Sequence, residues 1–338
     1  MAQTRNITKI SVVIPICGAA GTLTECIEAV RKSGGEATEI IVVDNASADE
    51  TLEAARAPGC RVVGVEKGDG PAAARNRGAK EAGGEILLFL DSDVVLADDA
   101  LPAMERAFRE TGCDALVGHY EKPPKGTPPF TALFDSFVIR HHEQSAADGG
   151  IPWFWASIGA VRRELFEETG GFREDRRGAE DFEFGYDLSS RGSKILRREN
   201  ICGSHKRVHT LWYYLKEVFC RTADLTDLAL RRKGGAPGTP YSNWRDRIDL
   251  PMAWLMFLTL LAGTFVKALW WLNIVSAGTA FIYSFVINRG MFKFAGKGRI
   301  FFFGPFMFYC HVATYLTAGI AILFGAGRFV VRSIGGGR

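Results

Sequence analysis

The stretch EILLFLDSDVVLADD, Glu85–Asp99, decides the fold class and raises the first question about function. Its first half is almost entirely apolar, as expected of a strand that is buried on both faces of a sheet. Two aspartates, Asp91 and Asp93, follow at the end of this strand, one residue apart. Because side chains alternate along a strand, we expect the two carboxylates to lie side by side.

Adjacent carboxylates repel each other unless a positive charge lies between them. A solvated strand end would explain the pair without any function. A divalent cation would explain it chemically, because Mg²⁺ and Mn²⁺ prefer carboxylate oxygens. The two interpretations have to be weighed against the rest of the sequence.

Apolar stretches resembling buried parallel strands alternate with segments of helical composition. The strand candidates are KISVVIPI (9–16), EIIVVDN (39–45), CRVVGVE (60–66) and EILLFLD (85–91). The helix candidates between them are TLTECIEAVRKSG (22–34), ADETLEAARA (48–57) and GPAAARNRGAKEAGG (70–84). This alternation predicts an α/β, Rossmann-like fold with a mostly parallel sheet covered by helices on both faces.

In such sheets, ligands bind beyond the carboxyl ends of the strands. Pro15 follows the first predicted strand, Asp44 the second and Asp69 the third, and Asp91 and Asp93 follow the fourth. A helix cap would explain Asp44 alone. Together with the aspartate pair, it favours a ligand site over several unrelated solvated loops.

A dinucleotide-binding domain is the obvious rival interpretation. It needs the pattern G-x-G-x-x-G directly after the first strand, but the turn here is CGAAGTL (17–23). An aspartate pair also has no task in hydride transfer. Arg75 and Arg77, in the predicted helix that begins at residue 70, face either a phosphate or solvent, and the sequence leaves both open.

Five motifs occur in an order that resembles the family 2 glycosyltransferases, which have a GT-A fold. The likeness covers roughly residues 9–200. The motifs are SVVIPICGAAGTLTECIEAV (11–30), EIIVVDNASADET (39–51), GPAAARNRGAKEAGGEILLFLDSDV (70–94), GAVRRELFEETGGFRED (159–175) and GAEDFEFGYDLSSRG (178–192).

The resemblance implies a binding site for a nucleotide sugar, with a UDP- or GDP-sugar favoured. Asp44 would contact the nucleoside. Asp91 and Asp93 would form the DxD motif that holds the diphosphate through Mn²⁺ or Mg²⁺, with Asp93 the usual metal ligand. The expected donor-binding residues are Pro15, Asp44, Asp69, Arg75 and Asp91.

The resemblance also implies that Glu180–Asp181 supplies the catalytic base, and Asp181 is the preferred candidate. A base is needed because the incoming hydroxyl loses a proton, while a metal neutralises the departing diphosphate. Attack opposite the leaving group would invert the anomeric centre. An acidic first turn of a helix would also explain these residues. The Q-x-x-R-W motif of processive members is missing between 205 and 234, which favours transfer of one sugar.

Several features allow two interpretations. His205 and His209 either complete the metal shell, contact phosphate or do neither. The segment RHHEQ (140–144) lacks partners at zinc-ligand spacing. The aromatic residues of PWFWAS (152–157) either line an acceptor pocket or pack in the core. The apolar stripe between residues 211 and 225 either packs on the protein or lies at a bilayer surface.

Composition gives no support for nucleic-acid binding, because the net charge is only +3. Seven scattered cysteines without a C-x-x-C pair are typical of a reducing compartment, and the N-terminus has no signal-peptide pattern. We expect a catalytic domain over residues 1–230, a basic linker over 231–250 and a transmembrane region of two to three helices over 251–330.

The membrane prediction rests on two long apolar stretches. Lys267 is the only charged residue from 251 to 287, and there is none from 300 to 327. A span needs ~20 apolar residues, so we expect short spans near 251–266 and 270–287 and a further span at 300–327. A buried helical subdomain is the alternative.

Basic residues before the first span and after the second favour a multi-pass protein of the inner (cytoplasmic) membrane with a cytosolic catalytic domain. Such an anchor would suit a lipid-linked acceptor in the synthesis of an envelope glycolipid or polysaccharide. Two other functions are weighed against this one. A GT-A domain without turnover could serve as a scaffold subunit, and a nucleotidyltransferase shares the sheet and the metal aspartates.

Overall fold

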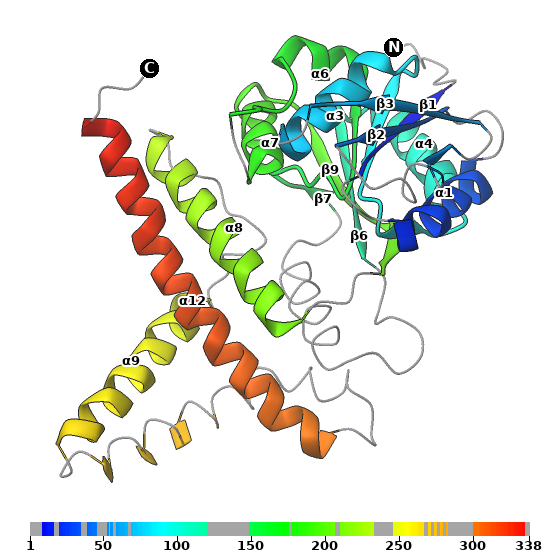
Figure 1. The fold of residues 1–338 in the computed structure, drawn as a ribbon. Helices are drawn as coiled ribbons and strands as arrows, with labels where there is room; N and C mark the ends of the chain where they lie inside the picture. The colour runs from blue at the N-terminus through cyan, green and yellow to red at the C-terminus, as the bar shows by residue number, and fades with distance from the viewer. Residues whose placement is uncertain are drawn as a thin grey trace. The chain divides into compact units, whose positions relative to one another are not determined.

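A computed structural model of the chain describes the predicted sheet domain and several helices of the C-terminal part (Figure 1). The residues described are 9–16, 20–34, 39–45, 53, 55–56, 59–66, 69–120, 149–175, 178–206, 210–232, 246–266 and 300–334, with short stretches between 270 and 282. The chain divides into two compact units. One comprises residues 1–124 and 146–207, and the other residues 125–145 and 208–338.

Within the described residues, the first unit is built on one sheet of nine strands. Their order is β3-β2-β1-β4-β8-β6-β9-β5, with β7 paired to β9. The strands are β1 (Ile10–Ile16), β2 (Glu39–Asp44), β3 (Cys60–Gly64), β4 (Ile86–Leu90), β5 (Val94–Leu96), β6 (Ala115–Tyr120), β7 (Gly149–Gly150), β8 (Ile158–Arg162) and β9 (Ile195–His205).

The four strands predicted from the sequence form the parallel half of the sheet. β1 pairs in parallel with both β2 and β4, and β2 pairs in parallel with β3. β4 is completely buried, which explains its unbroken apolar sequence. β8 is antiparallel to β4 and to β6, while β9 runs parallel to β6. The predicted α/β, mostly parallel fold is therefore confirmed.

Helices cover both faces of the sheet (Figure 1). The even-numbered residues of β1, from Val12 to Ile16, belong to a core shared with α1 (Ala20–Gly34) and α4 (Ala100–Thr111). The opposite face carries α3 (Gly70–Glu81). A Cβ on Gly78 of α3 would lie 2.3 Å from Val13 of β1. Glycine thus allows α3 to pack directly on the sheet.

An aromatic cluster lies on the same face as α3 and supports the region described below. Phe89 of β4 contacts Phe154, Phe166 and Phe172. Phe166 belongs to α6 (Arg163–Thr169), and Phe184 of α7 (Glu180–Ser190) packs on Phe154, Phe166 and Phe172. Burial of such rings stabilises the fold by about 1.5–3 kcal/mol each, so the cluster fixes α6 and α7 against β4.

The described part of the second unit consists mainly of three helices. They are α8 (Leu211–Arg231), α9 (Asp246–Phe265) and α12 (Ile300–Ile334). α8 and α12 run parallel, because Phe219 packs on Phe324 and, further along both helices, Asp227 pairs with Arg332. The apolar stripe of α8 therefore packs on protein. The sequence had led us to place α8 in the catalytic domain, whereas it groups with the second unit.

Among the described residues, one helical stretch, Phe308–Ile334, is long and apolar enough to cross a membrane. It overlaps the predicted span at 300–327. α9 overlaps the predicted span at 251–266 but does not meet the same criterion. Most of the predicted span at 270–287 lies outside the described residues. The multi-span arrangement expected from the sequence is thus not supported by the described part of the chain.

Candidate active site

The carboxyl ends of the parallel strands bring predicted site residues to one edge of the sheet. Asp44 ends β2 and lies in register with Ile16 of β1 and Gly64 of β3. Pro15 lies beside it in β1, opposite Val43. Asp91 follows β4, the other neighbour of β1. β1 thus separates Asp44 from Asp91.

Asp69 has a local role in the chain. Its Oδ2 accepts a hydrogen bond from the backbone N–H of Glu66 at 3.1 Å. Asp69 directly precedes α3, but its side chain makes no capping hydrogen bond to that helix. The side chain therefore stabilises the turn between β3 and α3.

The two aspartates of the motif at 91–93 have different partners. β4 ends at Leu90, and the backbone N–H of Val94 donates to the carbonyl of Asp91 at 3.0 Å, which closes a turn. The alternation of an extended strand therefore does not apply at this point. Instead of facing one shared partner, the Asp91 carboxylate contacts Arg75 and Ser157, whereas Asp93 faces His205.

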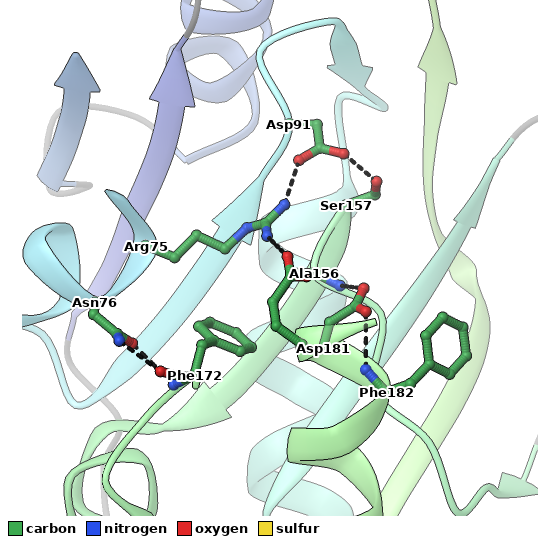
Figure 2. A network of polar contacts seen from close by, with 9 residues as sticks. Arg75, Asn76, Asp91, Ala156, Ser157, Phe172, Asp181 and Phe182 are labelled. Carbon is green, nitrogen blue, oxygen red and sulfur yellow. Dashed lines mark hydrogen bonds and ion pairs between the residues drawn. The ribbon is translucent and has the colours of Figure 1, made fainter. Parts of the chain in front are cut away.

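Both oxygens of Asp91 accept hydrogen bonds within the protein (Figure 2). Arg75 donates to Oδ1 at 3.0 Å and the Ser157 hydroxyl donates to Oδ2. Burial by itself raises the pKa of the Asp91 carboxyl, but the charge of Arg75 and the hydrogen bonds from Ser157 and Arg75 outweigh it. The net effect lowers the pKa of Asp91, so this carboxylate stays ionised at neutral pH.

Arg75 connects Asp91 to the beginning of α7. Its side chain is 8% exposed, and its second terminal nitrogen donates to Glu180 Oε1 at 2.7 Å. The sequence suggested that Arg75 faces phosphate or solvent, but its guanidinium lies in the interior between two carboxylates. Arg77, two residues on, is half-exposed and pairs with Glu81 of the same helix.

Glu180 and Asp181 occupy the first turn of α7, as their acidic character predicts. Glu180 is buried against Arg75, whereas Asp181 is partly exposed. The Asp181 carboxylate accepts hydrogen bonds from the backbone N–H groups of Ala156, at 3.2 Å, and Phe182, at 2.8 Å (Figure 2). The two adjacent acids therefore have distinct surroundings.

Asp181 is the acid whose ionisation is shifted toward neutral pH. Burial is the largest cause, and the nearby charge of Glu180 adds to it, while the charge of Arg75 opposes both. Together they raise the pKa of Asp181 to about 7. A carboxylate with a pKa near the working pH is suited to accept a proton and release it again.

Asp93 and His205 form a second polar pair. His205 Nε2 lies 3.6 Å from Asp93 Oδ2, and both side chains are 17% exposed. The backbone fixes them, because β5 and β9 pair with Val94 opposite His205, and the N–H of Lys206 donates to the carbonyl of Asp93 at 2.8 Å. The centroid of the Tyr120 ring lies 4.9 Å from that of the His205 imidazole.

These two residues fit part of a metal-binding shell. Neighbouring ligands of an octahedral ion with bonds of ~2.1 Å lie roughly 3 Å apart, close to the separation of Asp93 Oδ2 and His205 Nε2. The described part of the chain holds no group of three or more His, Cys, Asp or Glu side chains arranged for a metal. Substrate oxygens or water would have to complete the shell.

Several residues that shape this region were not identified from the sequence. Ser157 holds Asp91, and Asn76 donates to the carbonyl of Phe172 at 2.7 Å and accepts from its N–H at 2.9 Å. Gly185 allows α7 to approach the chain closely, because a Cβ there would lie 2.1 Å from the backbone nitrogen of Phe154. The sequence signal for this close approach was a glycine inside an acidic motif that otherwise has helical composition.

The other candidates from the sequence were the aromatic residues of PWFWAS (152–157) and several histidines. Trp153 and Phe154 are buried in the core, while Trp155 is partly exposed and packs on Tyr120. The segment RHHEQ (140–144) and His209 lie outside the described residues.

Comparison with known proteins agrees with this geometry. The family model "Glycosyl transferase family 2" matches residues 11–170. The glycosyltransferase GlyG of Streptococcus pneumoniae is 33% identical over 116 residues, which are 33% of this chain and 38% of GlyG. The glycosyltransferase AglE of Haloferax volcanii is 26% identical over 212 residues, which are 60% of this chain and 68% of AglE.

A solved structure shares the fold. The mannosyltransferase PcManGT of Pyrobaculum calidifontis, in complex with GDP-Man and Mn²⁺, superposes with a TM-score of 0.57 at 20% identity, covering 95% of this chain and 88% of that one. At this identity the likeness concerns the GT-A fold only. The family match ends before Glu180 and Asp181. Residues 11–170, which include Asp44, Asp91 and Asp93, are therefore similar to glycosyl transferase family 2.

Proposed function

We propose that the protein is a membrane-anchored, metal-dependent glycosyltransferase that moves one sugar from a nucleotide sugar to an acceptor hydroxyl with inversion. One observation carries this proposal. Arg75 joins Asp91 of the first acidic motif to Glu180 of the second through hydrogen bonds of 3.0 and 2.7 Å. Asp91, proposed to support the donor site, and the turn of α7 that carries the proposed base Asp181 therefore belong to one polar network.

On the donor side, Asp93 is the proposed metal ligand and His205 its partner. A metal bound there would neutralise the negative charge of the departing nucleoside diphosphate. A mixed oxygen and nitrogen pair suits Mn²⁺ better than Mg²⁺, because Mg²⁺ is bound almost wholly by oxygen. Asp91, although included in the sequence-based metal site, has both oxygens engaged by Arg75 and Ser157, so we assign it to support of the donor site.

The nucleoside is proposed to bind at the end of β2. Asp44 would accept hydrogen bonds from the base or ribose, since it stands at the edge where parallel sheets bind ligands. Pro15 and Asp69 are proposed as further donor-site residues next to it. A UDP- or GDP-sugar remains the proposed donor, and GDP-Man is the nucleotide sugar in the solved structure that shares the fold.

Asp181 is the proposed general base. It is partly exposed, unlike Glu180, and its pKa of about 7 lets it take the proton of an acceptor hydroxyl near neutral pH. The two backbone N–H groups that hydrogen-bond to it fix the carboxylate in one orientation. One base and one metal are enough for a single inverting displacement.

Attachment to the cytoplasmic membrane is proposed from the second unit. Phe308–Ile334 is apolar and long enough to span a bilayer, and α9 exposes large apolar side chains such as Leu258 and Phe265. A membrane anchor favours a lipid-linked acceptor and, because nucleotide sugars are cytosolic, a cytosolic catalytic domain. The expected process is synthesis of an envelope glycolipid or polysaccharide.

Thermal unfolding of the detergent-purified full chain tests the donor assignment. UDP, GDP, CDP and dTDP are each added with and without Mn²⁺. Stabilisation by one nucleotide that requires the metal would support the proposal and name the donor class. Unchanged unfolding with all four would contradict it and favour a scaffold without turnover.

The acceptor is tested separately in membranes that contain the protein. Radiolabelled UDP-glucose or GDP-mannose is supplied, and the lipid extract is counted. Label in the lipid fraction that depends on Asp181 would support a lipid acceptor. Label confined to water-soluble products would contradict that part of the proposal without affecting the reaction class.

A further inference from the structure

Arg75 occupies a position that simple donor binding would not require. Its guanidinium is almost fully buried and each terminal nitrogen donates to a different carboxylate, one on each side (Figure 2). The first is Asp91, at the end of β4, and the second is Glu180, at the start of α7. Both terminal nitrogens are thus engaged by the protein itself.

The chemistry of this bridge requires arginine. A guanidinium is planar and can direct two separate nitrogens at two acceptors, whereas the ammonium of lysine is a single point charge. The guanidinium also lies over the Phe172 ring, 5.9 Å from its centroid, which restrains the side chain further. Phe172 is itself held to α3 by the hydrogen bonds of Asn76.

The start of α7 needs such an anchor. Ala179, which precedes the helix, has φ of 59° and contributes no side-chain cap. The left-handed conformation is unfavourable for a residue with a Cβ, so surrounding contacts must hold it. The Arg75–Glu180 ion pair is a buried charged contact in the first turn of α7, and the hydrogen bond from Ala156 N–H to Asp181 is a further tie.

Asp91 and the first turn of α7 are in fact connected by two routes. One runs from Asp91 through Arg75 to Glu180. The other runs through neighbouring residues, because Ser157 donates to Asp91 and Ala156 donates to Asp181. The first route consists of two ion pairs made by a single side chain that reaches both ends, whereas the second consists of hydrogen bonds from two adjacent residues.

We propose that Arg75 is a positioning residue that holds the base-bearing turn of α7 at a fixed place relative to Asp91 and the donor site, and that it does not bind the donor phosphates. This inference rests on the proposed function. Its consequence is that one buried side chain, together with the contacts of Ser157 and Ala156, sets the separation of the donor and base sides. A displacement of about 1 Å of a catalytic group can cost on the order of 100-fold in rate, so the bridge controls turnover rather than donor affinity.

The test compares Arg75→Lys with Arg77→Lys. Both substitutions keep the charge and lie on the same helix. Arg77, however, is half-exposed and pairs with Glu81 of its own helix. Two readouts are measured on the full chain in detergent. The first is hydrogen exchange of the amides in residues 180–186, which needs no activity.

The second readout separates turnover from affinity. Release of nucleoside diphosphate from UDP-glucose or GDP-mannose gives kcat, and thermal stabilisation by UDP or GDP with Mn²⁺ gives the nucleotide Kd. We expect Arg75→Lys to speed exchange in residues 180–186 and to lower kcat by about 10- to 100-fold, with the Kd changed less than about threefold. Arg77→Lys should match the original protein in all three.

Two results would overturn the inference. A rise in nucleotide Kd as large as the loss of kcat would make Arg75 a donor ligand, and unchanged exchange together with unchanged kcat would leave it without a role. Should the original protein bind no nucleotide, the proposed function fails, while the exchange experiment still decides whether Arg75 anchors α7.

Glu180→Gln provides a second variant in case Arg75→Lys does not fold. It weakens the same ion pair from the other end and should also speed exchange in residues 180–186 without weakening nucleotide binding. If Arg75 acts through Glu180, the double variant should lose no more kcat than Arg75→Lys alone. Additive losses, or Glu180→Gln with the exchange of the original protein, would contradict the proposal.

Discussion

His205 Nε2 lies 3.6 Å from Asp93 Oδ2 because β9 pairs with β5 in the register that sets His205 opposite Val94. The pair links the last strand of the first unit to the aspartate motif. A strand register holds its residues more firmly than a loop would. The fold itself therefore places the Asp93 carboxylate beside the His205 imidazole, without the need for a bound ligand.

Asp93→Asn should abolish the dependence of nucleotide binding on Mn²⁺. An amide oxygen carries no negative charge and binds a divalent cation much more weakly than a carboxylate. The measurement is thermal unfolding with nucleotide, with and without the metal. Asp98→Asn is the matched control, because Asp98 is exposed and pairs with Lys32. Retention of the full metal-dependent shift in Asp93→Asn would refute the metal assignment.

Transfer should depend on pH through Asp181. The base must be ionised, and its pKa is raised to about 7, so kcat should rise with pH and level off above about 7. Glu180→Gln should move this rise to lower pH, because the Glu180 charge contributes to the raised pKa. A pH profile of nucleotide release checks both, and a rise that moves to higher pH in Glu180→Gln would contradict the assignment.

The same ionisation predicts a change in stability. Asp181 binds its proton more tightly in the folded state, with a pKa of about 7 against the ordinary aspartate pKa of 3.8. It therefore destabilises the fold progressively as pH rises between these values. The stability of Asp181→Asn relative to the original protein should increase from about pH 4 to about pH 7 and then stay constant. Denaturant unfolding across this range measures it, and a difference independent of pH would speak against the raised pKa.

Gly185→Ala should displace α7. The added Cβ would lie 2.1 Å from the Phe154 nitrogen, which is backbone and cannot move aside easily. We expect a loss of about 1–3 kcal/mol in the free energy of unfolding, together with a lower kcat. Gly21→Ala in α1 is the control, since a Cβ there meets nothing within 4 Å. Equal stability of the two variants would show that α7 tolerates the shift.

Asp227→Ala should loosen α12 from α8. Asp227 is 5% exposed and pairs with Arg231 at 2.7 Å and with Arg332 at 3.2 Å. Its removal leaves two cations without this acceptor, at a cost of about 1–3 kcal/mol. Faster proteolysis of α12 in detergent is the expected result. Lys216→Ala, at an exposed position of α8, should leave the rate unchanged, and equal rates in both variants would contradict the prediction.

The parallel half of the sheet could be predicted from sequence because its strands are buried on both faces. β1, β2, β3 and β4 begin and end within two residues of the predicted bounds. The same pattern placed Asp44 and Asp91 at one edge, since the carboxyl ends of parallel strands share an edge. Local periodicity and the topology of parallel sheets were enough for these features.

The connections within the site could not be predicted in the same way. Arg75 meets Glu180 across 105 residues of chain, and no local pattern records such a pairing. The turn at Asp91–Val94 also broke the alternation that would have set Asp91 beside Asp93. Ser157 was overlooked because the aromatic residues before it dominate the motif. Side-chain partners far apart in sequence depend on packing that a single sequence does not display.

The pairing of α8 with α12 neutralises two arginines near the C-terminus. Arg328 bonds to Asp224 and Arg332 to Asp227. An arginine neutralised by a neighbouring helix has little charge left to interact with anionic phospholipid headgroups. In the proposed membrane-anchored arrangement, these two residues would therefore weigh little in the sorting of basic segments to the cytoplasmic leaflet, and the helix beside α12 would set its orientation.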